Sequence, residues 1–406
     1  MKNFIKLFKL LILSFNFLFC IVFYFVSKFY PKNNNLILFG SWNGKLFKGD
    51  VKFLYLHMIN NQKKYTCIWI TKNIEIYKLL KSNNLPCYYW LSFKGFIAAL
   101  RAKYYFISHS HFDINQYFSG GAIILNLMHY VYCPKYLGRM LHANNLLKKI
   151  YSILSDPITY VIDNTNFYIC SSKFIENRVK KIYKISNLKN KTIIIPNIKK
   201  EVLFLESKLD YLIKKEKNNF NLINKSKKNI FYLPTHRKSN LNFNLFNYNF
   251  NINELEKTLN DNNANLYINF HPSIVPSEDK KISMSKNIFL LNFRGDENDF
   301  LLNNFDLFIT DYSSMYSEFL LFKKPIILAP FDYKNYQKYD RNLSKEYFDL
   351  PSYFVYDWTQ LSYRLEVILN QKKDKHYKSR ELFKEKIYEK KTESCFHEII
   401  QMIDHL

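Results

Sequence analysis

The chain has 406 residues, 48% of them hydrophobic, so it can bury a sizeable core, and its length favours two domains over one. Its formal net charge of +25 is spread over many short lysine pairs, such as Lys63–Lys64. A diffuse positive surface argues against a groove for nucleic acid but favours contact with anionic lipid or an anionic substrate. The six cysteines form no CxxC pair, which argues against a zinc site or a disulfide framework and predicts reduced thiols in a reducing compartment.

The N-terminus reads as a membrane anchor over residues 1–32. Residues 10–26 carry no charge, and this length is near the lower limit for a helix that spans a bilayer. No small-residue cleavage site follows, so we do not expect a removed signal peptide. The run is flanked on both sides by lysines, namely Lys2, Lys6, Lys9, Lys28 and Lys32. The positive-inside rule therefore leaves the orientation of a spanning helix open. Two alternatives to a spanning helix are a helix that lies in the inner leaflet and a buried helix of the first domain.

Short apolar strands alternate with helical stretches along the rest of the chain. We expect strands at 35–41, 65–71, 103–109, 122–128, 167–172 and 192–197, and again at 229–235, 266–272, 287–292, 306–310 and 325–330. This alternation predicts an α/β fold of two tandem Rossmann-like, doubly wound domains in a GT-B-like arrangement, with the strand ends at a shared cleft. The expected segments are an N-terminal domain at 33–200, a linker or helix at 201–228, a C-terminal domain at 229–370 and a helical tail at 371–406.

Polar side chains recur at the ends of these strands. They are His129, Ser171, Ser172, Thr235, His236, Arg237, His271 and the group from Thr310 to Ser314. One histidine at a strand end is usually an ordinary hydrogen-bonded residue. In a parallel sheet, however, the strand ends face one crevice, so their recurrence predicts an anion site with a base beside it.

The segment "FITDYSSMYSEFLLFKKPIILAPFD" (308–332) reads as strand, turn, helix and strand. It places Ser313 and Ser314 where a helix begins, where unpaired N–H groups and the helix dipole suit a phosphate. We interpret Asp311 as the N-cap of that helix. The close pair His109 and His111 with Asp113 lacks convincing ligand spacing for a metal, because alternate residues do not make three ligands.

The block "LFITDYSSMYSEFLLFKKPIILAPFDYKNY" closely resembles the TDYSS segment of the CDP-glycerol glycerophosphotransferase family, the teichoic acid primases and polymerases. "NIFYLPTHR" is similar to the family's PTWR-like strand end, "YINFHPS" to its HP motif, and "FYICSSKFIENRVKKIY" to its segment before the interdomain crossover. The resemblance spans about residues 36–370, and the hydrophobic N-terminus is similar to that of membrane-associated members.

One segment departs from the family pattern. The family usually has an HGTPLK-like sequence after a strand, and this chain has "LMHYVYCPKYLG". His129 is kept, Tyr130 replaces the glycine, and the lysine is found at Lys135 with one extra residue in the spacing. Glycine lets the backbone come close to a ligand, and tyrosine does not at the same dihedral angles. We therefore expect this segment to differ from the family in how it places the acceptor or a phosphate.

The resemblance implies an enzyme that moves a polyol phosphate, foremost glycerol phosphate, from a CDP-activated donor to a hydroxyl of a lipid-linked or surface glycan, releasing CMP at the cytoplasmic face of the cell membrane. Positioning and electrostatics would carry such a transfer. By motif, His129 is the general base, His271 binds phosphate or assists the leaving group, Ser313 and Ser314 hold the diphosphate and Arg237 clamps it. The other residues implied around the substrate are Thr235, Thr310, Asp311 and Lys135. No cofactor, metal or nucleic acid is implied.

Two other functions stay open. One is a GT-B nucleotide-sugar glycosyltransferase, which the TDYSS block disfavours. The other is a catalytically inactive membrane scaffold, for which the altered segment after His129 is the hint. The sequence leaves open the polyol, the acceptor, the number of units added and the oligomeric state.

Overall fold

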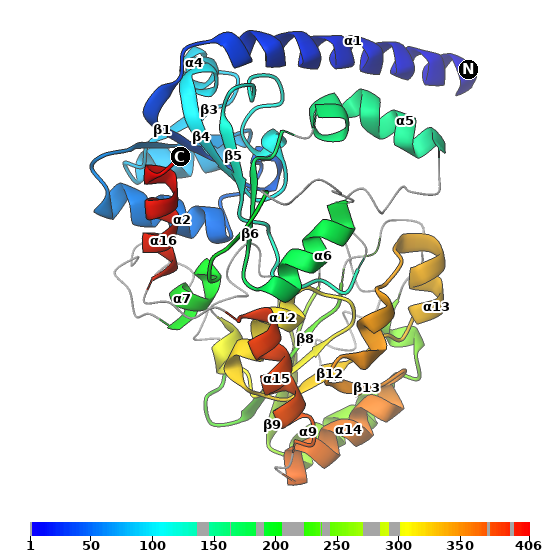
Figure 1. The fold of residues 1–406 in the computed structure, drawn as a ribbon. Coiled ribbons are helices and arrows are strands. Elements are labelled where there is room, and N and C mark those ends of the chain that lie inside the picture. Colours follow the sequence, from blue (N-terminus) through cyan, green and yellow to red (C-terminus); the bar gives the residue numbers. More distant parts are fainter. Residues whose placement is uncertain are drawn as a thin grey trace. The chain divides into compact units, whose positions relative to one another are not determined.

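The computed structural model describes residues 2–135, 146–162, 164–183, 191–204, 223–235, 237, 244–270, 285–291, 301–371, 374–389 and 394–406 (Figure 1). The chain divides into two compact units. The first comprises Met1–His129, His142–Leu209 and Lys390–Leu406, and the second comprises Tyr130–Leu141 and Asp210–Glu389. The residues directly after His129 thus belong to the second unit, and the C-terminal residues return to the first. The domain boundaries expected from the sequence stay predictions.

The first unit is built on a seven-stranded parallel sheet in the order β3-β2-β1-β4-β5-β6-β7. Its strands are β1 (Asn33–Phe39), β2 (Thr66–Thr71), β3 (Cys87–Tyr89), β4 (Ala102–Ile107), β5 (Ile123–Asn126), β6 (Phe167–Cys170) and β7 (Thr192–Ile194). Its helices are α1 (Lys2–Phe29), α2 (Asp50–Asn61), α3 (Ile74–Ser82), α4 (Phe93–Arg101), α5 (Leu146–Ser155), α6 (Lys173–Tyr183), α7 (Ile198–Phe204) and α16 (Cys395–Asp404). The central strands β1, β2 and β4 are buried over most of their length, which explains their nearly continuous apolar sequences.

The second unit repeats this plan with six parallel strands in the order β10-β9-β8-β11-β12-β13. Its strands are β8 (Lys228–Leu233), β9 (Ala264–Asn269), β10 (Ile288–Leu291), β11 (Leu307–Thr310), β12 (Ile326–Leu328) and β13 (Tyr353–Phe354). Its helices are α9 (Ile252–Asp261), α12 (Met315–Phe319), α13 (Tyr333–Asn335), α14 (Trp358–Gln371) and α15 (Tyr377–Ile387). Trp358 is buried in its core and donates its indole N–H to the Leu245 carbonyl at 2.9 Å.

The expected α/β fold with parallel sheets is confirmed, and every strand expected from an apolar run is present. The observed strands mostly end one to three residues before the expected ends, because the polar residues that close each run, such as His109 and Thr235, lie in the loop that follows. Two strands were missed. β3 and β13 have only three and two residues, too few to show a period.

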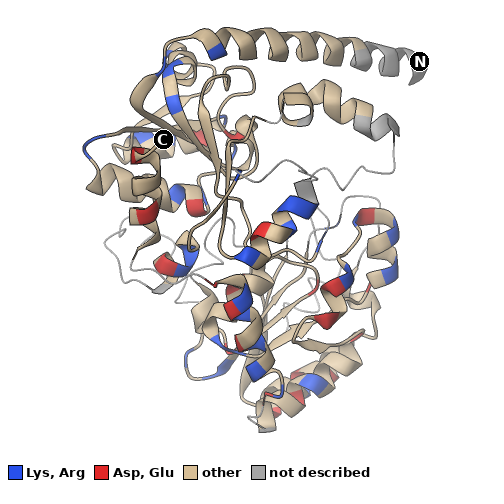
Figure 2. Cartoon of the chain, in the orientation of Figure 1, with Lys and Arg blue, Asp and Glu red and all other residues tan. Residues whose placement is uncertain are grey.

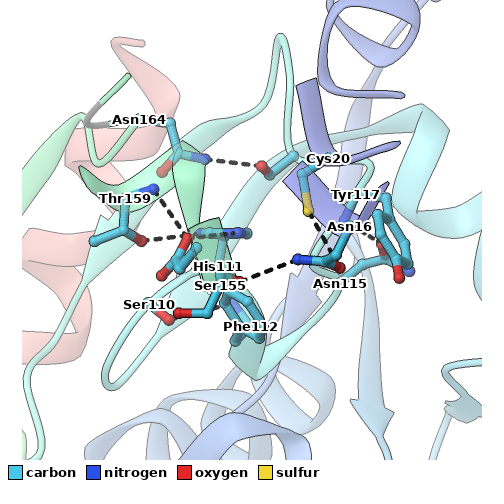
Figure 3. Close-up of polar contacts among 12 residues, drawn as sticks. Asn16, Cys20, Ser110, His111, Phe112, Asn115, Tyr117, Ser155, Thr159 and Asn164 are labelled. Carbon is cyan, nitrogen blue, oxygen red and sulfur yellow. Dashed lines mark hydrogen bonds and ion pairs between the residues drawn. The ribbon is translucent and has the colours of Figure 1, made fainter. Parts of the chain in front are cut away.

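Helix α1 is docked along one side by its own unit. The side-chain amide of Asn16 donates to the carbonyls of Leu154 and Ser155, at 3.5 and 3.3 Å, and Cys20 lies beside it (Figure 3). Further along, Phe23 packs edge-on against two rings of the loop before β5, those of Tyr117 and Phe118. Within the described part of the chain, α1 alone is long and apolar enough to cross a membrane, judged by length and composition.

The close approach of α1 depends on Gly120. The Gly120 amide donates to the buried Ser27 hydroxyl at 2.8 Å, and a Cβ on Gly120 would lie only 2.0 Å from the Tyr24 carbonyl oxygen. We therefore expect Gly120→Ala to cost about 3 kcal/mol of unfolding free energy, since the backbone must move. Gly49→Ala is the comparison, because its added methyl meets no atom within 4 Å and only its positive φ of 78° is strained, at about 1 kcal/mol. Denaturant unfolding measures both, and a wild-type midpoint for Gly120→Ala would contradict the close contact.

Candidate functional site

Three neighbouring strands of the first sheet bring a cluster of rings together at their carboxyl ends. His129 follows β5, and its ring stacks on that of His109, which follows β4, with centroids 3.8 Å apart and planes at 9°. Trp42, which follows β1, meets both rings edge-on at 5.4 and 4.9 Å. The Lys48 ammonium lies 4.1 Å from the Trp42 ring centroid. The base expected from the sequence is thus held in a fixed orientation by aromatic contacts.

Buried Asp113 fixes the orientation of His109. Its carboxylate accepts the backbone N–H of Ser108, His109 and Asn43 at 2.7, 2.8 and 2.5 Å, and the Ser108 hydroxyl at 3.0 Å. The Ser108 oxygen is 2.7 Å from His109 Nδ1, so Ser108 links the imidazole to the Asp113 carboxylate. Burial lowers the pKa of His109, although the Asp113 charge opposes this shift, and burial raises the pKa of Asp113. His109 is therefore a neutral ring against which His129 is placed.

Buried histidines predict a loss of stability in mild acid. Burial lowers the pKa of His57, His109, His111 and His376 below 6.5, so the unfolded chain binds their protons more readily than the folded one. The unfolding free energy should therefore fall as the pH drops through 6.5, by at most about 1.4 kcal/mol per pH unit for each histidine. The raised pKa of Asp113 acts in the opposite direction. The decisive comparison is thus His111→Gln. Its melting temperature should fall less between about pH 7 and pH 5 than that of the wild type. An equal fall in both proteins would contradict the lowered pKa of His111.

In the second unit, Arg237 is the centre of a buried ion-pair network. Its Nε and Nη2 donate to the two carboxylate oxygens of Asp332 at 2.8 and 2.7 Å, and Nη2 also donates to Asp311 at 2.8 Å. The guanidinium lies 5.0 and 4.7 Å from the ring centroids of Tyr312 and Tyr336. Only 5% of Arg237 is exposed. The bidentate partner of Arg237 is Asp332, and this network holds the ends of β8, β11 and β12 together. The expected role of Arg237 as a diphosphate clamp stays a prediction.

Asp311 also differs from its expected role as a helix cap. Its Oδ1 accepts the backbone N–H of Thr235 at 2.9 Å and of Tyr312 at 2.6 Å, and α12 begins only after Ser314. Burial would raise the pKa of Asp311, but the Arg237 charge and these hydrogen bonds outweigh it, so the pKa is lowered. An ionised, buried Asp311 therefore ties the turn after β11 to the end of β8.

Thr310 serves the same loop. Its hydroxyl donates to the Leu233 carbonyl at 2.7 Å, and the side chain is fully buried. His271 and His236 lie outside the described residues, so their expected roles stay predictions. Among the residues that the structure describes, no group of three histidine, cysteine or acidic side chains could hold a metal ion.

Four other polar side chains that the sequence predicts at the diphosphate belong to this unit, namely Ser313, Ser314, Thr235 and Lys135. Ser313 and Ser314 are half-buried, and the Ser313 hydroxyl accepts the Met315 N–H at 3.2 Å at the start of α12. The buried Thr235 hydroxyl has no hydrogen-bond partner among the described residues. Lys135 forms an antiparallel bridge with Leu343. Burial lowers the pKa of Lys135, and the Asp311 charge opposes the shift. A cation, hydroxyls and a helix start can together receive a phosphate.

Sequence reasoning missed Trp42 and Asp332 and set His109 aside as a failed metal ligand. All three follow strands at their carboxyl ends, namely β1, β12 and β4. Their position after a strand is the same signal that selected His129 and Thr235. The sequence reasoning did not apply this signal to Trp42 and Asp332.

Comparison with known proteins gives consistent results. A family model described as CDP-Glycerol:Poly(glycerophosphate) glycerophosphotransferase matches residues 22–403. The chain is 26% identical over 374 residues to a teichoic acid glycerol-phosphate transferase of Staphylococcus aureus (strain NCTC 8325 / PS 47), covering 87% of this chain and 89% of the relative. A structure of the wall teichoic acid polymerase TagF superposes with a TM-score of 0.68 at 18% identity, covering 92% and 89% of the two chains. A UDP-GlcNAc 2-epimerase from Neisseria meningitidis reaches 0.52 at 10% identity over 91% and 99%. These two likenesses show a shared fold.

Proposed function

Because this chain belongs to the CDP-glycerol:poly(glycerophosphate) glycerophosphotransferase family, and is a transferase of that type, we propose that it transfers glycerol phosphate from CDP-glycerol to a hydroxyl of a lipid-linked or surface-glycan acceptor. The family match over residues 22–403 is the observation that carries this proposal. A structure of TagF soaked with CDPG supports the choice of donor.

The reaction is an in-line displacement at the phosphorus that bears the glycerol. The acceptor oxygen forms a bond to this phosphorus, the bond to the bridging oxygen breaks, and CMP leaves with the electron pair. The proton of the acceptor hydroxyl passes to the imidazole of His129, which acts as the general base. The stacked His109 and the Trp42 edge support this role, since they hold the ring in one orientation before substrate binds.

We assign the diphosphate to Ser313, Ser314, Thr235 and Lys135. Their hydroxyls, the ammonium and the amides at the start of α12 can stabilise the charge that develops on the departing CMP. Arg237 and Asp311 act on this group indirectly, because they fix the loops that present it. His271 stays a candidate for binding phosphate or assisting the leaving group.

We further propose that the two units are Rossmann-like halves of a GT-B-type transferase that works at the cytoplasmic face of the membrane. The strand order supports the first part. In each sheet the first strand along the chain lies inside the sheet, the second and third strands are added on one side of it, and all later strands are added on its other side. This is the order of a doubly wound sheet. The apolar helix α1 supports the second, since a lipid-linked acceptor resides in the membrane.

Release of CMP tests this function. With a membrane extract from the native host as acceptor, the detergent-solubilised protein should release CMP from CDP-glycerol, and assays with CDP-ribitol and UDP-sugars define the donor. We expect Ser313→Ala/Ser314→Ala to lower the rate about 100-fold or more, as for lost donors to a developing negative charge. The exposed Ser226→Ala is the matched control and should keep the wild-type rate. Release of UDP alone would indicate a glycosyltransferase, and release of neither nucleotide would favour a scaffold.

A further inference from the structure

We propose that His109 is a second contact for the acceptor substrate, and that its ring accepts a hydrogen bond from a hydroxyl next to the one that His129 deprotonates. The acceptor would then carry two neighbouring hydroxyls, as the end of a sugar or a polyol does. The inference rests on the proposed function, in which His129 is the base, and it names the residue that selects the acceptor. It is carried by the hydrogen bonds that fix which nitrogen of His109 is protonated.

The Ser108 hydroxyl determines the tautomer of His109. The Ser108 oxygen lies 3.0 Å from Asp113 Oδ2 and 2.7 Å from His109 Nδ1, and it accepts the backbone N–H of Trp42 at 3.1 Å. Asp113 already accepts three backbone N–H groups, and donors around a carboxylate favour its charged form. Asp113 therefore also accepts the single hydrogen of the Ser108 hydroxyl. The Ser108 oxygen must then accept a hydrogen from His109, which places that hydrogen on Nδ1.

This tautomer leaves the other ring nitrogen of His109, Nε2, with a lone pair. Nε2 has no hydrogen-bond partner among the residues that the structure describes, and His109 is only half-buried. Figure 2 shows that β1 and β5, two of the strands that lead to this site, contain no charged residue. Burial lowers the pKa of His109, and although the Asp113 charge opposes this shift, the Lys48 charge adds to it. The ring is therefore neutral near pH 7, and its Nε2 can accept a hydrogen bond.

The backbone beside His109 is held in a strained conformation by the same two residues. Trp42 has a φ of 51°, in the left-handed region that bulky residues rarely adopt. Its N–H bonds to Ser108, and the next N–H, that of Asn43, bonds to Asp113. The Trp42 ring thereby meets the His109 ring edge-on, with centroids 4.9 Å apart. Strain of this kind concentrates at ligand sites, where the surrounding contacts preserve it.

The stacked rings of His109 and His129 restrict the acceptor. Their centroids are 3.8 Å apart and their planes differ by 9°, so hydroxyls bonded to the two rings must belong to the same small part of the acceptor. Neighbouring carbons of a sugar or a polyol supply such a pair. An acceptor with an isolated hydroxyl would leave Nε2 without a partner, and a site built to bond a substrate hydroxyl discriminates strongly against a substrate that lacks it.

Nitrogen-15 NMR of the full-length protein, labelled in its histidines, tests the tautomer. The signals of His109 are assigned as those lost in His109→Phe. We expect a hydrogen on Nδ1 and an unprotonated Nε2 near neutral pH. A hydrogen on Nε2, or on both nitrogens, would overturn the proposal. The spectrum needs no turnover, so a failure of this inference is distinguishable from a failure to release CMP.

Oxidation of the acceptor tests the second hydroxyl. Periodate followed by borohydride cleaves a pair of neighbouring hydroxyls and leaves isolated alcohols, and treatment with borohydride alone is the control. With oxidised membrane extract from the native host, the wild-type rate of CMP release at limiting extract should fall about 10-fold or more relative to the control extract. Equal rates with the two extracts would overturn the proposal.

Two variants connect this effect to His109. His109→Phe keeps a ring that can stack but has no ring nitrogen, so it should show the lower rate already with the control extract and change little on oxidation. Its KM for CDP-glycerol should equal that of the wild type. His397→Phe, on the exposed side of α16, should behave as the wild type with both extracts. A further 10-fold fall of His109→Phe on oxidation would overturn the proposal, because another residue would then bind the second hydroxyl.

Discussion

His129→Ala is expected to lower CMP release from CDP-glycerol by about 100- to 10,000-fold, the range that a positioned general base contributes. The substitution removes the group that accepts the acceptor proton and leaves the diphosphate-binding residues in place. Steady-state rates at saturating donor measure the effect. Thermal unfolding should change little, because the imidazole contributes ring contacts and no part of the sheet core.

Two variants sharpen this result. His397→Ala, on the exposed side of α16, should keep the wild-type rate. His109→Ala should lose less activity than His129→Ala and should alter the pH profile of kcat, since it removes the ring that positions the base without removing the base. Full turnover by His129→Ala would contradict the role of His129 as the general base and would indicate that another residue accepts the proton.

Arg237→Ala should produce the largest loss of stability, about 3–5 kcal/mol of unfolding free energy. It leaves Asp311 and Asp332 buried without their counter-charge, at 1% and 5% exposure. Arg237→Lys should recover only part of the loss, because an ammonium cannot replace the planar fork that bonds both oxygens of Asp332. Urea unfolding with hydrogen exchange on β8 and β11 measures the change.

The comparison for Arg237 is Lys64→Ala. Lys64 pairs with Asp404 at 2.5 Å, and the two side chains are 56% and 36% exposed, so the loss should be small compared with that of Arg237→Ala. A stable Arg237→Ala protein that had lost only its affinity for CDP-glycerol would contradict the structural role and support the diphosphate clamp expected from the sequence.

The contrast between Arg237 and His129 shows how far the sequence reaches. Apolar runs reveal the strands and therefore which residues stand at their ends, so His129, Thr235 and Arg237 could all be selected. The partner of a selected residue depends on strand order. Asp332 lies far from Arg237 in the chain, and only the placement of β12 beside β11, which itself pairs with β8, brings the two together. Pattern reasoning has no access to that neighbour.

The segment "SHSHFD" gives the complementary lesson. Its spacing was judged for metal binding, and the chemistry that it supports instead is orientation of a base. Asp113 turns back onto the amides of Ser108 and His109 because a short 3-10 helix, His111–Asp113, reverses the chain after β4. Such a local reversal has no periodic signature. The stack of His109 on His129 likewise depends on β4 and β5 being neighbours.

Transfer of the glycerol-side phosphate is the most direct test of the proposed reaction. CDP-glycerol carrying label in the phosphate next to glycerol is incubated with the protein and a membrane extract from the native host, and label in the lipid-linked or glycan fraction is measured together with free CMP. The account predicts one labelled phosphate in the acceptor for each CMP released, and loss of both in His129→Ala. Label that stays in the soluble nucleotide fraction, or acceptor that gains glycerol without phosphate, would contradict polyol phosphate transfer.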